Sequence, residues 1–183
     1  MSTWDAAAAE WYAERYGEYP TNRLALDDLD LPMDGAVLDI GCGTAAALRH
    51  IGLRVARLIG VDPVPRMVEI AAERLVGHPA AERIELRIGS ASRLPVADGA
   101  IDVVLAFDSF DHWGDKAAGL AEVQRVLAPG GRFVVVKDAG APGAKRSAST
   151  FGAAVEAAGF TVVEAREMRG EGATFTRWIC AAG

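Results

Sequence analysis

Five short apolar runs, rich in β-branched residues, alternate with amphipathic helical patterns, and this alternation constrains the fold more than any other feature. The runs cover residues 36–40, 57–61, 84–88, 101–107 and 132–137. Strands that are buried on both faces of a parallel sheet have this composition. Between them, apolar residues recur at steps of three and four, as in helices packed on a sheet. Right-handed crossovers then predict a doubly wound, Rossmann-like α/β sheet, with any ligand at the carboxyl ends of the strands.

The last part of the chain predicts a closing hairpin. The sequence FGAAVEAAG predicts a helix that ends at Gly159. Only GEG and its neighbours separate the next two apolar runs, 160–168 and 174–181, so we expect an antiparallel pair that brings the mostly parallel sheet to seven strands. Trp178 would pack on the sheet or on an end helix. Segment 139–150, rich in Gly, Ala and Ser, predicts a mobile loop, which leaves a site at this end open or completed by a partner subunit.

The first 30 residues form a separate helical pattern. Trp4, Trp11, Tyr12 and Tyr16 lie near one helical stripe, and a second short helix is predicted from about residue 21 to 29. Two compatible interpretations stay open: a lid over a ligand site, and an amphipathic helix docked on the core through its aromatic side chains. In a chain of 183 residues, the remaining 31–183 predict one domain.

Composition and charge exclude several classes of protein. A net charge of −6 and a pI near 5.1 disfavour binding to phosphate backbones, and no apolar run approaches the roughly 20 residues that span a bilayer. The two cysteines, Cys42 and Cys180, have no metal-ligand spacing, so we expect no metal site. The amino-terminal sequence lacks the basic and apolar regions of a secretory signal, so we expect a cytoplasmic protein. From the net charge and the short apolar runs, we expect that it binds neither nucleic acid nor membrane.

The strongest local motif is LDIGCGTAAA, residues 38–47, a glycine-rich turn between a predicted strand and a predicted helix. Gly41 and Gly43 allow close approach of the backbone to a ligand, and the helix that follows presents unpaired N–H groups. Gly41, Gly43 and Ala46 also match the dinucleotide pattern G-x-G-x-x-G/A, with Asp62 near the expected spacing of about 20 residues. Taken alone, the motif fits a nucleotide-like ligand or only a tight turn.

Five segments in the same order resemble the class I S-adenosylmethionine-dependent methyltransferases, in particular their small-molecule branch. They are VLDIGCGT, GVDPVPRMVEIAAERL, GSASRLPVADGAIDVVLAF, AEVQRVLAPGGRFVVV and VEAAGF, and the resemblance covers about residues 36–181. It implies S-adenosylmethionine as cofactor and methyl transfer to an O, N or C atom of a small molecule, by a monomer or homodimer. Two alternatives stay open: a cofactor-binding module without turnover, and a nicotinamide-dependent oxidoreductase, which Asp39 disfavours because dehydrogenases typically have an apolar residue there.

For the methionyl portion of the cofactor, the resemblance implies binding by the turn of Gly41, Cys42 and Gly43 and by Asp39. The carboxylate would act on the cofactor's ammonium directly or through water. Ala45 departs from the family, which commonly has a third glycine there. Because alanine suits the first turn of a helix better than glycine does, we expect binding to survive.

For the nucleoside, the resemblance implies that Asp62 accepts hydrogen bonds from both ribose hydroxyls and that Pro63 and Met67 pack on the adenine. The Ala91 N–H would meet the adenine ring. Ser90 stands where the family usually has an aspartate that receives the adenine amino group. Its hydroxyl is a weaker, neutral acceptor, so we expect reduced adenine affinity.

The segment FDSFDHW, residues 107–113, follows the fourth predicted strand. By the resemblance, the backbone of Ala106 and Phe107 approaches the sulfonium of the cofactor. Asp108 and His112 are the candidate catalytic residues, since a carboxylate or an imidazole can take a proton from an acceptor. A purely structural role remains the alternative for both.

Four residues are candidates for binding the methyl acceptor: Tyr12, Tyr16, Asp111 and Trp113. Tyr12, Phe107 and Trp113 would form an apolar wall that suits both a cation and its neutral product. The carboxylate of this set could hold an amine or cap a helix. Lys137 and Asp138 end the fifth predicted strand near the same place, and we interpret them as a solvated pair.

Overall fold

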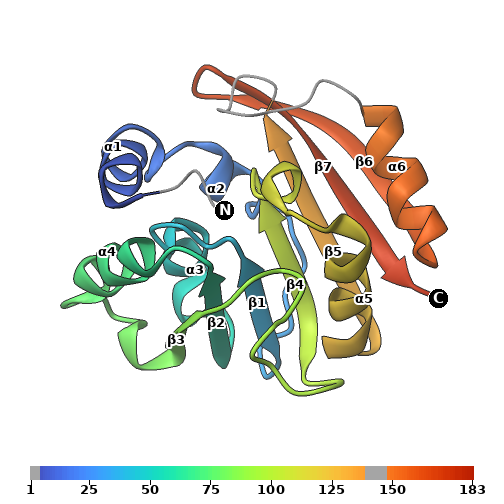
Figure 1. Ribbon diagram of the computed structural model, residues 1–183, viewed down its shortest axis with the longest axis horizontal. Coiled ribbons are helices and arrows are strands. Elements are labelled where there is room, and N and C mark those ends of the chain that lie inside the picture. Colours follow the sequence, from blue (N-terminus) through green and yellow to red (C-terminus); the bar gives the residue numbers. More distant parts are fainter. Residues whose placement is uncertain (1–4, 139–147) are drawn as a thin grey trace.

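A single seven-stranded sheet forms the centre of the computed structural model, which describes residues 5–138 and 148–183 (Figure 1). Its strands are β1 Ala36–Ile40, β2 Arg57–Asp62, β3 Ile84–Ile88, β4 Ile101–Phe107, β5 Leu127–Asp138, β6 Phe160–Gly170 and β7 Ala173–Ala182. Their order across the sheet is β3-β2-β1-β4-β5-β7-β6, with β1 to β5 parallel and β7 antiparallel to both β5 and β6. The predicted doubly wound, Rossmann-like sheet with a closing hairpin is confirmed.

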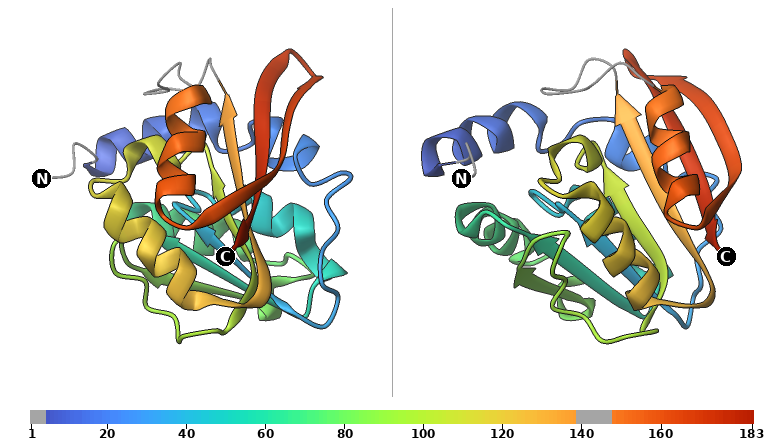
Figure 2. Two further views of the ribbon diagram at one scale, coloured as in Figure 1. Left: turned by 90° about the vertical axis from the view of Figure 1, so that its right-hand side faces the viewer. Right: turned by 45° about the vertical axis from the view of Figure 1, so that its right-hand side comes forward.

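Helices cover both faces of the sheet. They are α1 Ala6–Tyr16, α2 Thr21–Leu24, α3 Ala46–Ile51, α4 Pro65–Leu75, α5 Lys116–Val126 and α6 Ala148–Ala157, with 3-10 turns η1 Gly52–Arg54, η2 Ala81–Arg83 and η3 Phe110–His112. Figure 2 shows α5 and α6 on one face of the sheet and α2 and α3 on the other. Among the described residues, no helix is long and apolar enough to cross a membrane.

Two apolar clusters, one on each face of the sheet, hold the helices in place. In β4, Val104 and Ala106 belong to the cluster under α5 and α6, whereas Val103 and Leu105 belong to the cluster under α3. Successive side chains of a strand point to opposite faces, so a strand covered on both sides needs apolar residues throughout. The continuous apolar run of β4 is therefore what the fold requires.

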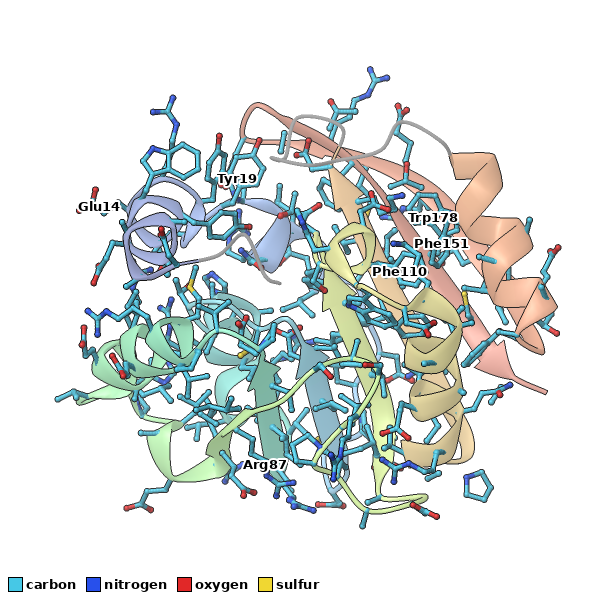
Figure 3. All side chains as sticks on the ribbon, in the orientation of Figure 1. Glu14, Tyr19, Arg87, Phe110, Phe151 and Trp178 are labelled. Carbon is cyan, nitrogen blue, oxygen red and sulfur yellow. The ribbon has the colours of Figure 1, made fainter. Side chains whose placement is uncertain are left out.

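Trp178 packs against α6, one of the two positions predicted for it. Its ring centroid lies 5.0 Å from that of Phe151, which lies 5.1 Å from that of Phe110 (Figure 3). These three rings join β7, α6 and η3. The aromatic contacts therefore also position the segment that follows β4.

The helix α1 docks on α4 mainly through small side chains, and the predicted docking by aromatic residues is confirmed for Tyr12 but not for Trp11. Ala9 and Ala13 are buried, whereas Trp11 is 51% exposed. Tyr12 packs at the edge of the cluster that Ala9 forms with α4. Alanine lets two helix backbones approach closely, so this contact needs no large side chain. Trp4, which belongs to the predicted stripe, lies outside the described residues.

Three predicted boundaries differ from those of the structure. The second amino-terminal helix covers Thr21–Leu24 rather than 21–29, and β5 extends beyond 132–137 at both ends. The helix α6 already begins within the segment predicted as the loop 139–150. The rest of that predicted loop, 139–147, lies outside the described residues.

A buried arginine ties the segment after α2 to the hairpin. The side chain of Arg177, on β7, is 2% exposed. Its guanidinium donates to the Ala25 carbonyl at 3.0 Å, to Asp28 Oδ1 at 2.6 Å and to Glu164 Oε1 at 2.8 Å. Because a buried, unpaired charge is strongly destabilising, these acceptors are what permits an arginine at this position.

Candidate functional site

A cavity of about 490 Å³ opens at the carboxyl ends of β1, β2 and β4. Its volume is typical of small-molecule sites, and its position is the one predicted for a ligand of a doubly wound sheet. Of the residues proposed from the sequence, the lining contains Tyr12, Gly41, Gly43, Asp62, Pro63, Met67, Ser90, Ala91, Phe107, Asp108, His112 and Trp113. The other five lie outside the lining and are Tyr16, Asp39, Cys42, Ala106 and Asp111.

The turn after β1 is shaped by a close contact with the segment after β4. Gly41 has φ +73°, and a Cβ on it would lie 2.5 Å from the Ser109 Cβ. The Ser109 hydroxyl donates to the Ile40 carbonyl at 2.5 Å, which fixes the serine against the turn. Glycine is therefore required at position 41 both for its left-handed backbone and for space. Ser109, which also lines the cavity, was not identified from the sequence because its role depends on this long-range contact.

Ala45 is strained, and the predicted reason for its suitability is wrong. It lies just before the helix α3, with φ +59° and ψ 28°, in the left-handed region that disfavours residues with a Cβ. The family's usual glycine would adopt this conformation freely. The Ala45 side chain is fully buried in the cluster under α3, so its methyl group contributes packing that offsets part of the strain.

Asp62 connects the ends of β1 and β2. Its Oδ2 accepts from the Gly43 N–H at 3.0 Å, and its Oδ1 accepts from the Val64 N–H at 2.9 Å. Burial raises the pKa of Asp62, while these two backbone hydrogen bonds lower it. Each carboxylate oxygen can accept more than one hydrogen bond, so the side chain keeps acceptor capacity toward the cavity.

Asp39 is buried and is not among the residues that line the cavity, so its expected contact with the cofactor's ammonium, directly or through water, stays a prediction. It is the residue before the last one of β1, and its side chain is buried. Its Oδ1 has no hydrogen-bond partner among the described residues. Burial, with the nearby charge of Asp62, raises the pKa of Asp39 to about 7. Cys42 and Ala106 are also buried in the apolar clusters.

Asparagine at position 39 is expected to flatten the pH dependence of stability. The pKa of the Asp39 carboxyl is higher in the folded state than the unfolded value of about 3.9, so the folded state binds this proton more tightly. Loss of the proton from Asp39 as the pH rises therefore destabilises the fold. Between pH 5 and pH 8, the free energy of unfolding of the natural sequence should fall by about 2 kcal/mol more than that of Asp39→Asn. Urea unfolding at the two pH values measures this difference, and equal changes in the two proteins would contradict it.

The segment after β3 forms the far wall of the cavity. Gly89, Ser90, Ala91 and Ser92 all line it. The Ser90 and Ser92 hydroxyls lie 3.2 Å apart and share a hydrogen bond. Ser90 therefore presents a neutral hydroxyl at the place where the resemblance puts a carboxylate.

Asp108 anchors the amino-terminal segment to the ends of β4 and β5. It has φ +51°, a conformation that aspartate tolerates better than most residues. Its Oδ1 accepts from the Asp138 N–H at 2.6 Å, and its Oδ2 accepts from the Thr21 hydroxyl at 3.1 Å. Burial raises the pKa of Asp108 to about 6. Thr21 had no signal in the sequence, because 87 residues separate it from Asp108.

The interpretation of Lys137 and Asp138 as a solvated pair is wrong. Lys137 Nζ lies 3.0 Å from Asp111 Oδ1, and both side chains are nearly buried. The Asp138 side chain is buried and accepts a hydrogen bond from the Tyr19 hydroxyl. Asp111 thus neutralises a lysine instead of lining the cavity.

The rest of the segment after β4 contains a helix cap and an aromatic wall. Asp115 caps α5, accepting from the Ala118 N–H at 2.9 Å. Phe107 and Trp113 line the cavity and are nearly buried, and the exposed His112 lies on the same wall. The described residues contain no group of three or more His, Cys, Asp or Glu side chains arranged to hold a metal ion.

The fold and the cavity have the features of the class I S-adenosylmethionine-dependent methyltransferase superfamily. The defining features are the strand order, the glycine turn after β1, and the carboxylate after β2 that meets this turn in one cavity. The chain belongs to the methyltransferase-domain family, whose profile matches residues 38–135.

Comparison with known proteins agrees with this assignment. An uncharacterised 37.1 kDa protein in a transposon of Streptomyces fradiae is 39% identical over 113 residues, covering 60% of this chain and 32% of that protein. A ubiquinone/menaquinone biosynthesis C-methyltransferase of Geotalea uraniireducens is 30% identical over 118 residues, covering 63% of this chain and 50% of that protein. The match thus spans about a third to a half of these relatives. The crystal structure of a SAM-dependent methyltransferase from Aquifex aeolicus has the same fold, with a TM-score of 0.83 at 18% identity over 99% of this chain and 100% of that one.

Proposed function

We propose that this protein transfers a methyl group from S-adenosylmethionine to a small-molecule acceptor. One observation carries the proposal: Asp62 and the Gly41–Gly43 turn lie in the same cavity and contact each other, with the Gly43 N–H 3.0 Å from Asp62 Oδ2. A carboxylate suited to ribose hydroxyls and a side-chain-free turn suited to the methionyl group are thereby next to each other.

The residues present fit this cofactor. A Cβ on Gly43 would meet no atom within 4 Å, so this part of the turn is open to a ligand. Asp62 retains acceptor capacity for the ribose, and Pro63 and Met67 offer apolar surface for the adenine. The Ala91 N–H and the Ser90 hydroxyl supply polar groups on the opposite wall.

When bound, S-adenosylmethionine supplies the activated methyl group on its sulfonium. The main work of the chain is to align the acceptor and to exclude water. Phe107 and Trp113 provide aromatic walls that favour a cation, and His112 lies on the same wall, where it would take a proton from an acceptor that requires deprotonation. Asp108 would serve the acceptor end of the cavity.

We further propose that α1 acts as a lid. Tyr12 lines the cavity from this helix, and two contacts hold its carboxyl end: the Thr44 hydroxyl donates to the Gly17 carbonyl at 2.7 Å, and Arg74 donates to the Ala13 carbonyl at 2.8 Å. Thr44 directly follows the glycine turn, so the position of the lid is coupled to the cofactor site. The acidic net charge supports a small metabolite rather than a nucleic acid as substrate, and we propose action in the cytoplasm as a monomer or homodimer.

Alanine at position 62 tests the proposal. Asp62→Ala should weaken binding of S-adenosylmethionine and of its demethylated product by about 1.5–3 kcal/mol, because charge-assisted hydrogen bonds are lost. Isothermal titration calorimetry measures the change, with Asp34→Ala, an exposed charge before β1, as the control that should bind normally. Unchanged affinity of Asp62→Ala for S-adenosylmethionine would contradict the cofactor assignment.

The two alternatives from the sequence give different results in the same protein preparation. Binding of NAD without binding of S-adenosylmethionine would favour a nicotinamide enzyme. Binding of S-adenosylmethionine without methyl transfer in a broad screen of small acceptors would favour a cofactor-binding module. We expect cofactor binding and transfer to at least one acceptor.

A further inference from the structure

The charge of the cavity lining is one-sided. Among the described residues that line it, Asp62, Asp108 and Asp115 carry carboxylates, and none is a lysine or an arginine. Lys137, which lies on β5 behind this wall, is paired with Asp111 at 3.0 Å. A bound anion would therefore meet three carboxylates, with His112 as the one basic side chain of the described lining, whereas a bound cation would be stabilised.

Two of the three carboxylates already have a role. Asp62 faces the glycine turn and is the proposed ribose ligand. Asp115 caps α5. Asp108 is left: its two oxygens accept from the Asp138 N–H and the Thr21 hydroxyl, which are both neutral donors. No salt bridge to Asp108 forms within the described residues, so its charge is without a counterion there.

Aromatic rings flank this end of the cavity. Phe107 and Trp113 line it, and Tyr12 lines it from α1. The Tyr12 ring packs at a tilt against Tyr16, with ring centroids 5.3 Å apart. Tyr16 in turn packs at a tilt against Tyr19, which is labelled in Figure 3, with ring centroids 5.9 Å apart. Tyr12, Asp62 and Asp108 all line the cavity, and burial, together with the charges of Asp108 and Asp62, raises the pKa of the Tyr12 hydroxyl. Aromatic faces next to a carboxylate are the surroundings in which proteins bind organic cations.

We propose that the methyl acceptor carries a positively charged nitrogen, and that this nitrogen binds between the Asp108 carboxylate and the aromatic rings of Tyr12 and Trp113. The inference rests on the proposed function, since it concerns the acceptor end of the same cavity. It assigns Asp108 to acceptor binding, and it excludes phosphorylated and carboxylated acceptors that lack a cationic group.

The test compares three probes of one shape that differ in charge. Choline is the cation, 3,3-dimethylbutan-1-ol is its neutral isostere, and 3,3-dimethylbutanoate is the anion. Each is titrated into protein saturated with S-adenosylhomocysteine, and binding is followed by ligand-observed NMR. We expect choline to bind at least tenfold more tightly than the neutral isostere, and the anion to bind most weakly.

Asparagine at position 108 then isolates the carboxylate. Asp108→Asn keeps the side-chain shape, tolerates the left-handed backbone, and can keep both hydrogen bonds because the Thr21 hydroxyl can reverse its direction. The preference for choline should fall below threefold in this variant and should persist in Asp34→Asn, which changes the net charge equally at an exposed site. Thermal unfolding verifies that both variants are folded.

The outcomes separate the two levels of the proposal. Equal binding of the three probes by the natural sequence, or an unchanged preference in Asp108→Asn, would overturn the assignment of a cationic acceptor. A loss of S-adenosylhomocysteine affinity in Asp108→Asn as large as the loss for choline would also overturn it, because the carboxylate would then serve the cofactor. Absence of S-adenosylhomocysteine binding by the natural sequence would instead refute the proposed function itself.

Discussion

Gly41→Ala should weaken S-adenosylmethionine binding about 100-fold and lower the free energy of unfolding by about 2–4 kcal/mol. The left-handed backbone at φ +73° accounts for about 1–2 kcal/mol of the loss. The rest arises because the new Cβ would lie 2.5 Å from the Ser109 Cβ, and Ser109 is held by the Ile40 carbonyl. The turn must therefore shift, and its N–H groups move away from the cofactor site. Calorimetric titration and urea unfolding measure the two effects.

Gly43→Ala is the matched control for this prediction. Its φ of +52° also disfavours alanine, yet a Cβ there would meet no atom within 4 Å. We expect a loss of only about 1–2 kcal/mol in the free energy of unfolding. Ser109→Gly introduced together with Gly41→Ala removes the overlapping atom and should recover part of the lost stability, which a double-mutant cycle quantifies. Equal losses in Gly41→Ala and Gly43→Ala, with no recovery in the double variant, would show that the contact with Ser109 is unimportant.

A double variant should lower the free energy of unfolding by about 3–5 kcal/mol when it combines Asp28→Ala with Glu164→Ala. These substitutions leave the guanidinium of Arg177, 2% exposed, with the Ala25 carbonyl but without a carboxylate. An uncompensated buried charge is more costly than the loss of the ion pairs themselves. Urea unfolding at neutral pH measures the effect.

The reverse substitution, Arg177→Met, provides the comparison. The side chains of Asp28 and Glu164 are 45% and 36% exposed, so both carboxylates can return to water when the arginine is removed. Methionine retains much of the buried apolar volume. We therefore expect a loss at least about 1 kcal/mol smaller than in the double alanine variant. A larger loss in Arg177→Met would mean that packing of the arginine stem, and not charge, dominates at this position.

The sheet was predictable because its strands are buried on both faces. Such strands are continuous apolar runs, and their carboxyl ends meet at one edge, so the positions of Gly41, Asp62, Ser90 and Phe107 around one cavity followed from local patterns. The docking of α1 was not predictable in this way, because Ala9 contributes close approach rather than hydrophobic area.

Several details of the site depend on contacts and boundaries that local patterns do not show. Asp39 precedes the last residue of β1 and is not in the cavity lining, whereas Asp62 is the last residue of β2 and lines the cavity. The left-handed conformation of Ala45 depends on the exact start of α3, and boundaries of this kind are not encoded in hydrophobic periodicity. The bonds of Asp108 to Thr21 and of Lys137 to Asp111 join segments distant in sequence, and no local pattern identifies such partners.

The position of β7 between β5 and β6 has a consequence for how the chain folds during synthesis. Strand β6 precedes β7 along the chain but reaches the sheet only by pairing with it. Until Ala173–Ala182 has emerged from the ribosome, β5 therefore exposes an unpaired edge and β6 has no template. The contacts of β7 with β5 and β6 form last, and those with β5 join segments far apart in sequence, so this final step of folding should be slower than formation of the parallel strands. A nascent chain stalled before residue 173 should be prone to aggregation, because the edge of β5 is then unpaired.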